Sequence, residues 1–433
     1  MLDIQYIKNH FTELQEVADQ KKIDVSITTL LEKNQLKNQY LQQIEQLRQQ
    51  RNQLTHTISG HMQQQSLLPT EAIQALKDQV KQINQELQQL EQESKVVQQE
   101  YTQLMELVPN YVSPDTPQGQ SDKDNVVIRT WSTPPEFPFA FKDHIELGEI
   151  HQMIDTSRGV RVAGSRNYYL TGIGALLHRA VQQLALDLLL GKGYLPMEVP
   201  TLVRSSALSN TAFFPLGIDQ TFKIENEDKW LTGTSEVALV SYYQNEIIDL
   251  SQDAIRLAAV SQNFRSEVGS TGKDVRGLYR VHQFAKVEQV IFCEANAEIS
   301  EHIHQEITAN AEELLQLLEL PYQVVAVCTG DMSQKTYKQY DIETWMPSRQ
   351  SYGETHSSSN IHDFQARRAN IRYKDSEGNI QYCHTLNNTA VASPRILIPL
   401  LENHQYEDGS IYIPLALRPY LNNKAKLANP NFL

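Results

Sequence analysis

Four cations lie close together between residues 263 and 284, in a chain that is acidic overall. The stretch reads NFRSEVGSTGKDVRGLYRVHQF, and its cations are Arg265, Lys273, Arg276 and Arg280. The whole chain has 38 Lys and Arg against 52 Asp and Glu, which gives a net charge of −14 at pH 7. Clustered cations bind phosphate groups, whereas a chain-wide acidic excess repels nucleic acid. Any contact with nucleic acid should therefore be local.

Strand alternation would place these cations and their neighbours on one sheet surface, if two strands flank a loop over 268–277. One face of the first strand would carry Ser261, Asn263, Arg265 and Glu267. The same side of the returning strand would carry Arg280, His282, Phe284, Lys286 and Glu288, with Val281, Ala285 and Val287 opposite. Guanidinium groups, an aromatic ring and carboxylates suit a nucleotide, because they bind phosphate, stack on a base and accept an amino group. The alternative is a solvated sheet face with cross-strand ion pairs.

The segment over 26–109 has the periodicity of two long helices. A 3,4 alternation forms a seam in its second half: Ile73, Leu76, Val80, Ile83, Leu87, Leu90, Ser94, Val97, Tyr101 and Leu104. A looser seam in its first half has Tyr40, Ile44, Leu47, Leu54 and Ile58, with Lys37 and Arg51 also in seam positions. Ser59, Gly60 and residues 66–69 predict the turn between two antiparallel helices of about 35 residues each. The periodicity alone fits an oligomerisation coil equally well.

Length and composition indicate a globular chain of two or three domains, because 433 residues exceed one typical core. No apolar run approaches the roughly 20 residues that span a bilayer, and the N-terminus lacks the pattern of a secretory signal. We therefore expect a cytoplasmic protein without a membrane segment. Cys293, Cys328 and Cys383 are widely spaced and lack C-x-x-C pairing, which indicates reduced thiols and argues against a zinc site.

The chain divides at a segment rich in Pro, Gly, Ser and Asp. Residues 111–125 have this composition and predict a linker between an N-terminal domain, 1–110, and an α+β domain, 126–433. Within the second domain, 172–190 is expected to be a helix and 289–293 the end of a strand.

Several stretches, taken together, resemble one family. FRSEVGSTGKDVRGLYRVHQFAKVE, within 263–288, resembles motif 2 of class II aminoacyl-tRNA synthetases in the form found in seryl-tRNA synthetases. The helical arm and four further stretches follow in the family's order: GYLPMEVPTLV at 193–203 as motif 1, LTGTSEV at 231–237, THSSSNIHDFQARRANIRY at 355–373, and HTLNNTAVASPRILIPLLENHQ at 384–405 as motif 3. The resemblance covers essentially the whole chain. It implies an α+β catalytic domain with an antiparallel β-sheet flanked by helices, and an N-terminal two-helix antiparallel coiled-coil arm that binds tRNA.

The resemblance also implies roles around ATP. Arg265 would bind the α-phosphate and the substrate carboxylate, Glu267 would meet the adenine, and Phe284 would stack on it. Arg280 and Arg395 would hold the outer phosphates. Catalysis would rest on Arg265, Arg395 and Glu354, and Glu354 would bind Mg²⁺ together with Ser357. The remaining residues implied at the ATP site are Ser266, Val281, Thr355 and His356.

For the amino acid, the resemblance implies a polar pocket around the serine ammonium made by Thr234, Ser235, Glu236 and Glu288, with Arg265 on the carboxylate. Thr389 would hydrogen-bond the serine hydroxyl, supported by Asn387. Such a pocket rejects alanine because its polar groups would stay unpaired, and rejects threonine by steric exclusion. Lys273 and Arg276, at the loop tip, would meet the tRNA acceptor end.

The partners implied are tRNA(Ser), tRNA(Sec) in cells that have it, and a second copy of the chain bound through motif 1. The arm would contact the variable arm of the tRNA, although residues 1–110 hold only 10 Lys and Arg against 14 Asp and Glu, a net charge of −4. Three features depart from the family pattern: Gly353 stands where Arg usually precedes the Glu, Ser358 replaces a frequent Cys, and motif 3 reads NNTAVASPR.

Two rival hypotheses stay open. A paralogue could form seryl-adenylate but deliver serine to a carrier protein or a small molecule, for which the arm would have no use. The other hypothesis is a catalytically silent tRNA-binding or coiled-coil protein. The chain retains the arginines, Glu354 and the serine pocket, which argues against it.

Overall fold

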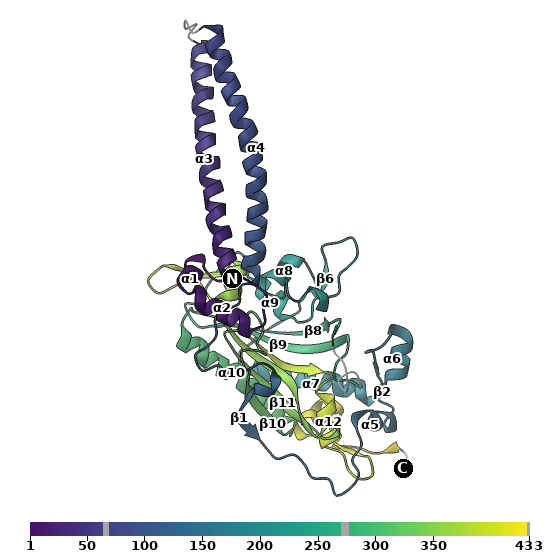
Figure 1. Cartoon of the computed structure of the whole chain (residues 1–433). Coiled ribbons are helices and arrows are strands. Elements are labelled where there is room, and N and C mark those ends of the chain that lie inside the picture. The colour runs from purple at the N-terminus through teal and green to yellow at the C-terminus, as the bar shows by residue number, and fades with distance from the viewer. Residues whose placement is uncertain (64–68, 270–276, 431–433) are drawn as a thin grey trace. The chain divides into compact units, whose positions relative to one another are not determined.

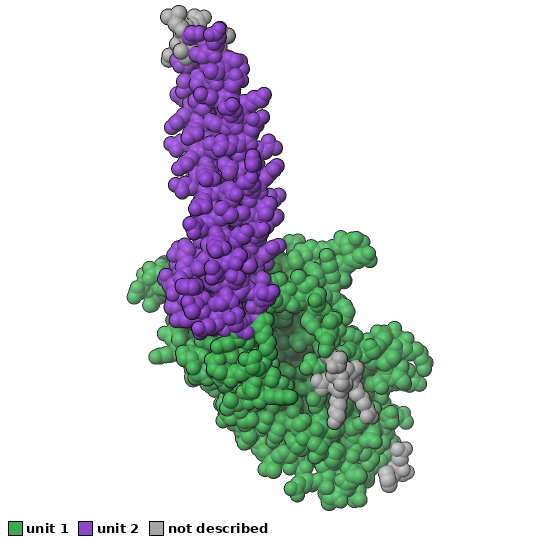
Figure 2. All heavy atoms as spheres, viewed as in Figure 1, with its two compact units in different colours: residues 1–2, 20–22, 109–433 green, residues 3–19, 23–108 purple. Residues whose placement is uncertain are grey.

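A computed structural model describes residues 1–63, 69–269 and 277–430. By its internal contacts the chain forms two compact units, which Figure 2 distinguishes by colour. Unit 1 comprises residues 1–2, 20–22 and 109–433, and unit 2 comprises residues 3–19 and 23–108. The chain therefore leaves unit 1 for the long excursion over 23–108 at Lys22 and returns to it at Pro109.

Unit 2 is built on two long antiparallel helices, α3 (Ile27–Gln63) and α4 (Thr70–Leu107), preceded by α1 (Ile4–Asn9) and α2 (Phe11–Gln20). Figure 1 shows α3 and α4 side by side. All the seam residues expected on the two helices are buried or half-buried, including the two cations. Lys37 places its ammonium 3.9 Å from the centre of the Tyr101 ring, which explains a lysine in the seam. The predicted coiled-coil arm is thus confirmed.

The expected break at Ser59 and Gly60 is wrong, because α3 continues through both residues to Gln63. A glycine inside a helix costs only about 1 kcal/mol relative to alanine. Ser59 is accommodated because its hydroxyl donates to the carbonyl of Thr55, one helical turn earlier, at 2.9 Å. The expected turn residues 66–68 lie outside the described part of the chain.

Unit 1 contains an eight-stranded sheet in the order β1-β10-β11-β12-β15-β9-β8-β4. Every neighbouring pair is antiparallel except β4 and β8, which are parallel. In this order the strands are Val126–Trp131, Tyr322–Ala326, Lys338–Met346, Ser351–His362, His384–Ser393, Gln283–Cys293, Ile255–Phe264 and Leu195–Met197. The sheet and its flanking helices confirm the α+β fold expected from the sequence.

The two faces of β9 pack into different cores, as strand alternation requires. Val287 and Ile291 join the core that contains residues of α7 (Ile173–Gly191), α10 (Ala297–Leu317) and α12 (Leu397–Asn403). Val290 and Phe292 join the core that contains residues of α9 (Glu236–Ser241) and α11 (Phe364–Ala369). The second face turns polar toward the start of the strand, and this is where the cavity described below opens.

Shorter elements complete unit 1. They are η1 (Asp122–Asp124), α5 (His144–Ile150), β2 (Ile154–Asp155), α6 (Thr156–Ala163), β3 (Tyr169–Leu170), β5 (Leu202–Val203), α8 (Ser205–Asn210), η2 (Ile218–Gln220), β6 (Trp230–Leu231), β7 (Ile247–Ile248), η4 (Pro347–Arg349), β13 (Arg372–Lys374), β14 (Ile380–Tyr382), β16 (Ile411–Tyr412), η5 (Leu415–Leu421) and β17 (Lys426–Leu427). The helix expected over 172–190 is α7, with Gly172 at its N-cap, and the strand expected to end over 289–293 is β9.

The segment expected as a linker, 111–125, belongs to unit 1 and packs against it. Ser113 is buried, and its backbone N–H donates to the carbonyl of Tyr337 at 2.9 Å.

The three cysteines are buried and form no disulfide, which confirms that they are free thiols. Among the described helices, α7 is long and apolar enough to cross a membrane by length and composition. Several of its apolar side chains, Leu177 and Val181 among them, are buried in the core beside the sheet, so packing within the domain accounts for them.

Three buried histidines lie on or beside the central strands. The rings of His362 (β12) and His384 (β15) stack with their centroids 4.3 Å apart, and the Tyr111 hydroxyl lies 3.0 Å from Nδ1 of His362. His304, on α10, contacts the carbonyl of Ser358 through Nε2 at 3.1 Å. Burial lowers the pKa of His304 and His384 to about 4 and that of His362 to about 3. All three rings are therefore neutral near pH 7.

Lowering the pH from 7.5 to 5 should lower the melting temperature. The folded pKa values lie below the ordinary value of 6.5, so the unfolded chain takes up protons that the folded chain refuses. The stabilisation is complete above pH 6.5 and is lost as the pH falls toward 4, at about 1–2 kcal/mol per group by pH 5. Thermal denaturation at pH 7.5, 6 and 5 measures this loss. His384→Gln should flatten the dependence and the exposed His56→Gln should not; equal slopes in both variants would contradict the assignment.

Candidate active site

A cavity of about 280 Å³ opens over the polar part of the central strands, and a second of about 530 Å³ adjoins it through shared residues. Fourteen of the residues proposed from the sequence line the first cavity: Thr234, Glu236, Arg265, Glu267, Arg280, Val281, Phe284, Glu354, Thr355, His356, Ser357, Asn387, Thr389 and Arg395. They come from segments up to 160 residues apart in the chain, and the fold brings them together around one space.

Strand register explains much of this convergence. Directly opposite residues of antiparallel strands share a face. Glu288 of β9 pairs with Thr389 of β15, and Asn387 of β15 pairs with Ser359 of β12. Since Phe284 and Lys286 lie on the same face of β9 as Glu288, three adjacent strands present polar side chains on one side of the sheet.

The proposed strands around the 268–277 loop are shorter than alternation suggested. β8 ends at Phe264 and β9 begins at Gln283, so the residues between them are not held in a regular ladder. Glu267 adopts a left-handed backbone conformation, with φ of 52°, which is unusual for a residue with a side chain. For the same reason Val281, which alternation assigned to the opposite face, lines the cavity.

Five proposed residues do not line this cavity or lie outside the described chain. Ser235 is fully buried, and the hydroxyl of Ser266 donates to the carbonyl of Asp219 at 2.5 Å. Lys273 and Arg276 lie outside the described residues. Glu288 is fully buried below the cavity floor and is joined to it through hydrogen bonds.

Three arginines surround one end of the cavity. The Arg265 guanidinium lies 5.3 Å from the centre of the Phe284 ring and donates to the carbonyl of Gly233 at 3.4 Å. Burial holds the pKa of Arg265 below its usual value, and the nearby charge of Arg395 adds to this effect. Arg280 forms a 3.5 Å ion pair with Glu267. An anion bound between these guanidinium groups would relieve their mutual repulsion.

Arg395 is held from below by backbone atoms. Its Nε donates to the carbonyl of Tyr279 and its Nη1 to the carbonyl of Glu354, both at 3.1 Å. Its guanidinium lies 4.6 Å from the centre of the Tyr279 ring, and that of Arg349 lies 4.3 Å from the same ring. The neighbouring Gly353 has little room for a side chain, because an added Cβ would lie 3.2 Å from Sδ of Met346 and 3.3 Å from the Tyr279 hydroxyl oxygen.

A carboxylate-rich corner lies where β11 meets β12. The register places Asp341 opposite Ser357 and Glu343 opposite Glu354. Burial first, and then the charge of Glu354, raise the pKa of Asp341 to about 8. A cation bound at this corner would offset the concentration of negative charge, and carboxylate and hydroxyl oxygens are ligands that Mg²⁺ accepts. Within the described ranges, however, no three His, Cys, Asp or Glu side chains form a metal-binding group. A metal here would need oxygen ligands from a bound phosphate or water.

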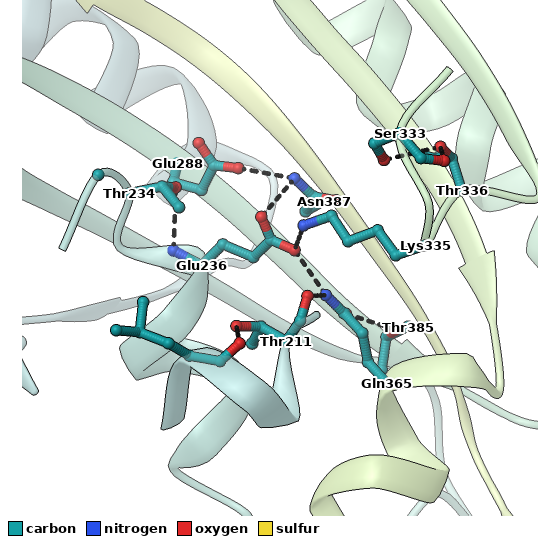
Figure 3. Close-up of polar contacts among 12 residues, drawn as sticks. Thr211, Thr234, Glu236, Glu288, Ser333, Lys335, Thr336, Gln365, Thr385 and Asn387 are labelled. Carbon is teal, nitrogen blue, oxygen red and sulfur yellow. Dashed lines mark hydrogen bonds and ion pairs between the residues drawn. The ribbon is translucent and has the colours of Figure 1, made fainter. Parts of the chain in front are cut away.

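The other end of the cavity is built on two buried glutamates (Figure 3). The Asn387 amide Nδ2 donates to Oε2 of Glu236 at 3.3 Å and to Oε1 of Glu288 at 3.1 Å. The Thr389 hydroxyl donates to Oε2 of Glu288 at 3.5 Å, and the Thr234 hydroxyl accepts from the backbone N–H of Glu236 at 3.2 Å. The Asn387 amide therefore joins the two carboxylates.

Sequence reasoning missed several residues of this end. Lys286 forms a 2.5 Å ion pair with Glu288, and Lys335 forms an ion pair with Glu236. Gln365 donates to the same Glu236 carboxylate at 2.7 Å. Strand alternation had placed Lys286 on the correct face without a role. Gln365 lies within the quoted stretch 355–373, but no periodicity singled it out, and no sequence signal marked Lys335.

The single imidazole in the cavity lining is neutral. Burial lowers the pKa of His356 to about 3. Its Nδ1 lies 2.8 Å from the hydroxyl of Thr355. The cavity therefore offers cations at one end and paired carboxylates with amide and hydroxyl groups at the other. This distribution suits a polyphosphate beside a small zwitterion.

Comparison with known families supports this chemistry. The family model of the tRNA synthetase class II core domain (G, H, P, S and T) matches residues 221–404, and that of the seryl-tRNA synthetase N-terminal domain matches residues 1–112. A serine–tRNA ligase of Deinococcus radiodurans is 40% identical over 438 residues, which cover 99% of this chain and 100% of the relative.

Two solved structures are similar over nearly their whole length. A seryl-tRNA synthetase of Pyrococcus horikoshii complexed with ATP is 33% identical, with a TM-score of 0.88 over 99% of this chain and 100% of its own. A cytoplasmic serine–tRNA ligase of Naegleria fowleri in complex with AMP is 26% identical, with a TM-score of 0.83 over 100% of this chain and 99% of its own.

Proposed function

The chain belongs to the seryl-tRNA synthetase family, so its activity is that of a serine–tRNA ligase, and we propose which of its residues carry each step. In the first step the serine carboxylate attacks the α-phosphorus of ATP. A bond forms between that carboxylate oxygen and phosphorus, and the bond to the β-phosphate oxygen breaks, which releases pyrophosphate. In the second step a terminal ribose hydroxyl of the tRNA takes the seryl group, and AMP leaves.

The observation that carries this proposal is the position of Arg265, at the arginine end of the cavity but close enough to the other end to act on it. Its guanidinium lies against Phe284, the proposed adenine-stacking ring, and its charge acts on Glu288 of the proposed serine end. It is therefore placed to neutralise charge that develops on the α-phosphate during attack. Arg280 and Arg395 would hold the departing pyrophosphate. Little proton transfer is needed in this step, and the neutral His356 supplies none.

At the serine end, the ammonium would meet Glu236, Glu288 and Thr234, while Thr389 would take the hydroxyl. The Asn387 amide, which donates to both glutamates, would hold the two carboxylates for this contact. A ligand without the hydroxyl would leave buried polar atoms unpaired, which is the physical basis for rejecting alanine.

We infer that ATP binds with Mg²⁺ at the corner formed by Glu354 and Ser357. A bound Mg²⁺ would neutralise phosphate charge during the reaction. The ATP complex of the Pyrococcus horikoshii relative supports ATP as the substrate, and the carboxylate-rich corner supports the cation.

Arg265→Ala should abolish serine-dependent exchange of pyrophosphate into ATP, with a loss of at least about a hundredfold, as for other groups that stabilise transition-state charge. Arg129→Ala is the matched control, since Arg129, on β1, pairs with Glu312 of α10 and does not line the cavity. Normal exchange in Arg265→Ala would show that Arg265 does not have this role. Absence of exchange in the unmodified protein would revive the silent-binding hypothesis.

We propose that tRNA(Ser) is bound by the arm of residues 1–110 through shape and backbone contacts, and that Lys273 and Arg276 meet its acceptor end. Aminoacylation of tRNA(Ser) should be efficient with the intact transcript and should fall when its variable arm is deleted, measured as kcat/KM. Exchange activity without any tRNA charging would favour the carrier-protein paralogue instead. We also propose, from the sequence, that the protein uses tRNA(Sec) where it is present and that it is cytoplasmic.

We further propose a homodimer that forms through motif 1. β4 is the last strand in the sheet order, and its Leu195 is 56% exposed. Leu202, also in motif 1, is 42% exposed. Exposed leucines at a sheet edge are typical of a surface that another chain covers. Sedimentation velocity should give a dimer for the unmodified protein and a monomer for Leu195→Asp. A monomeric unmodified protein would refute the interface.

A further inference from the structure

The loop over residues 333–336, between β10 and β11, forms one wall of the serine end of the cavity. Ser333 and Lys335 both line the cavity, and Figure 3 shows Lys335 reaching toward Glu236. Lys335 is 8% exposed. Its ammonium forms the ion pair with Glu236 and lies 4.5 Å from the centre of the Phe213 ring. A buried lysine thus enters the site from a segment with no regular secondary structure.

Lys335 contacts one particular oxygen of Glu236. Oε1 accepts from Lys335 and from Gln365 Nε2, the latter at 2.7 Å, and Gln365 is held in turn by the Thr385 hydroxyl at 2.9 Å. Oε2, on the side of Asn387, accepts one long bond of 3.3 Å among the described contacts. The two donors on Oε1 therefore fix the carboxylate and leave Oε2 with capacity for a ligand ammonium.

Among the described side chains that donate to Glu236, Lys335 is the one that carries a charge. Glu236 is 2% exposed, and its other side-chain donors, Gln365 and Asn387, are neutral amides. Removing one member of a buried ion pair leaves an uncompensated charge, which makes the remaining group move or take up a proton. Without Lys335, the Glu236 carboxylate would therefore be less well placed.

Two buried residues, Lys21 and Asn110, hold the loop in place. Together they donate hydrogen bonds to the backbone carbonyls of all four loop residues. Lys21 Nζ donates to the carbonyls of residues 333, 334 and 336 at 3.2, 3.4 and 2.8 Å. Asn110 donates through its backbone N–H to the carbonyl of residue 334 at 2.9 Å and through Nδ2 to that of Lys335 at 3.0 Å. An ammonium has three N–H groups, so these three carbonyls are enough to satisfy it.

Lys21 and Asn110 flank the excursion of the chain through residues 23–108. Both belong to unit 1, where Lys21 Nζ also lies 3.3 Å from the carbonyl of Asn110. Two residues that flank the excursion over 23–108, Lys21 and Asn110, therefore hold the loop of Lys335.

We propose that Lys335 is a positioning residue of the serine site, which acts by holding the Glu236 carboxylate, and that Lys21 and Asn110 fix its loop from the root of the arm. This inference rests on the proposed function, because Glu236 binds serine only if the chain activates serine. Lys335 pairs with the oxygen that serine does not use, so it orients the carboxylate without contacting the reacting atoms.

Steady-state pyrophosphate exchange tests this role with serine and ATP varied separately. Lys335→Met should raise the KM for serine by about tenfold to a hundredfold, the equivalent of one hydrogen bond to a charged group, and leave the KM for ATP unchanged. Lys335→Arg should restore most of the serine affinity, and Lys335→Gln, which keeps a donor without charge, should be intermediate. Lys338→Met is the matched control: Lys338 lies three residues later, pairs with Asp115 and Glu301, and does not line the cavity.

The root of the arm is tested by Lys21→Met, which should raise the KM for serine in the same direction. If it acts through Lys335, the double variant Lys21→Met/Lys335→Met should be no worse than Lys335→Met alone. An unchanged ATP KM in each variant shows that the fold is intact. A serine KM unaffected by Lys335→Met, or raised equally by Lys338→Met, would overturn the inference. Loss of exchange in the unmodified protein would instead overturn the proposed function.

Discussion

The burial of two carboxylates at the serine end of the cavity is the constraint on which the rest of the site depends. An ionised carboxylate inside a protein must be paired and hydrogen-bonded, or it takes up a proton. Glu288 meets this requirement within its own strand, through Lys286 two residues earlier. Glu236, at the start of a short helix, has no such neighbour and draws its partners from a distant loop, from α11 and from β15.

The same requirement explains how an acidic protein can hold a polyanion. The arginines at the ATP end are few, but backbone carbonyls, aromatic rings and single carboxylates keep them in place, and Arg265 is partly desolvated. In such a setting each guanidinium has a stronger electrostatic effect than it would on an exposed surface. The charge of the remaining surface therefore has little influence on the affinity for ATP, although it weakens non-specific attraction of nucleic acid.

Strand periodicity predicted the part of the site that lies on regular strands, because side chains two residues apart share a face. It placed Phe284, Lys286 and Glu288 together, and it predicted the arm from its heptads. It failed where the ladder ends, as at Val281. The resemblance, and not the alternation, placed Ser266 at the ATP site, whereas its hydroxyl donates to a carbonyl outside the cavity lining. Residues brought in from loops, above all Lys335, have no sequence period. Their place depends on tertiary contacts more than 90 residues away in sequence, which no local pattern records.

The residues of unit 1 that flank the excursion over 23–108 lie next to each other. This has a consequence for how such proteins can diverge. Equal insertions or deletions in α3 and α4 would leave the seam in phase and both anchoring residues untouched, provided that they come in whole heptads. Each heptad added to both helices would move the tip by about 10 Å. The length of the hairpin can therefore change in evolution while the sheet and its site stay the same.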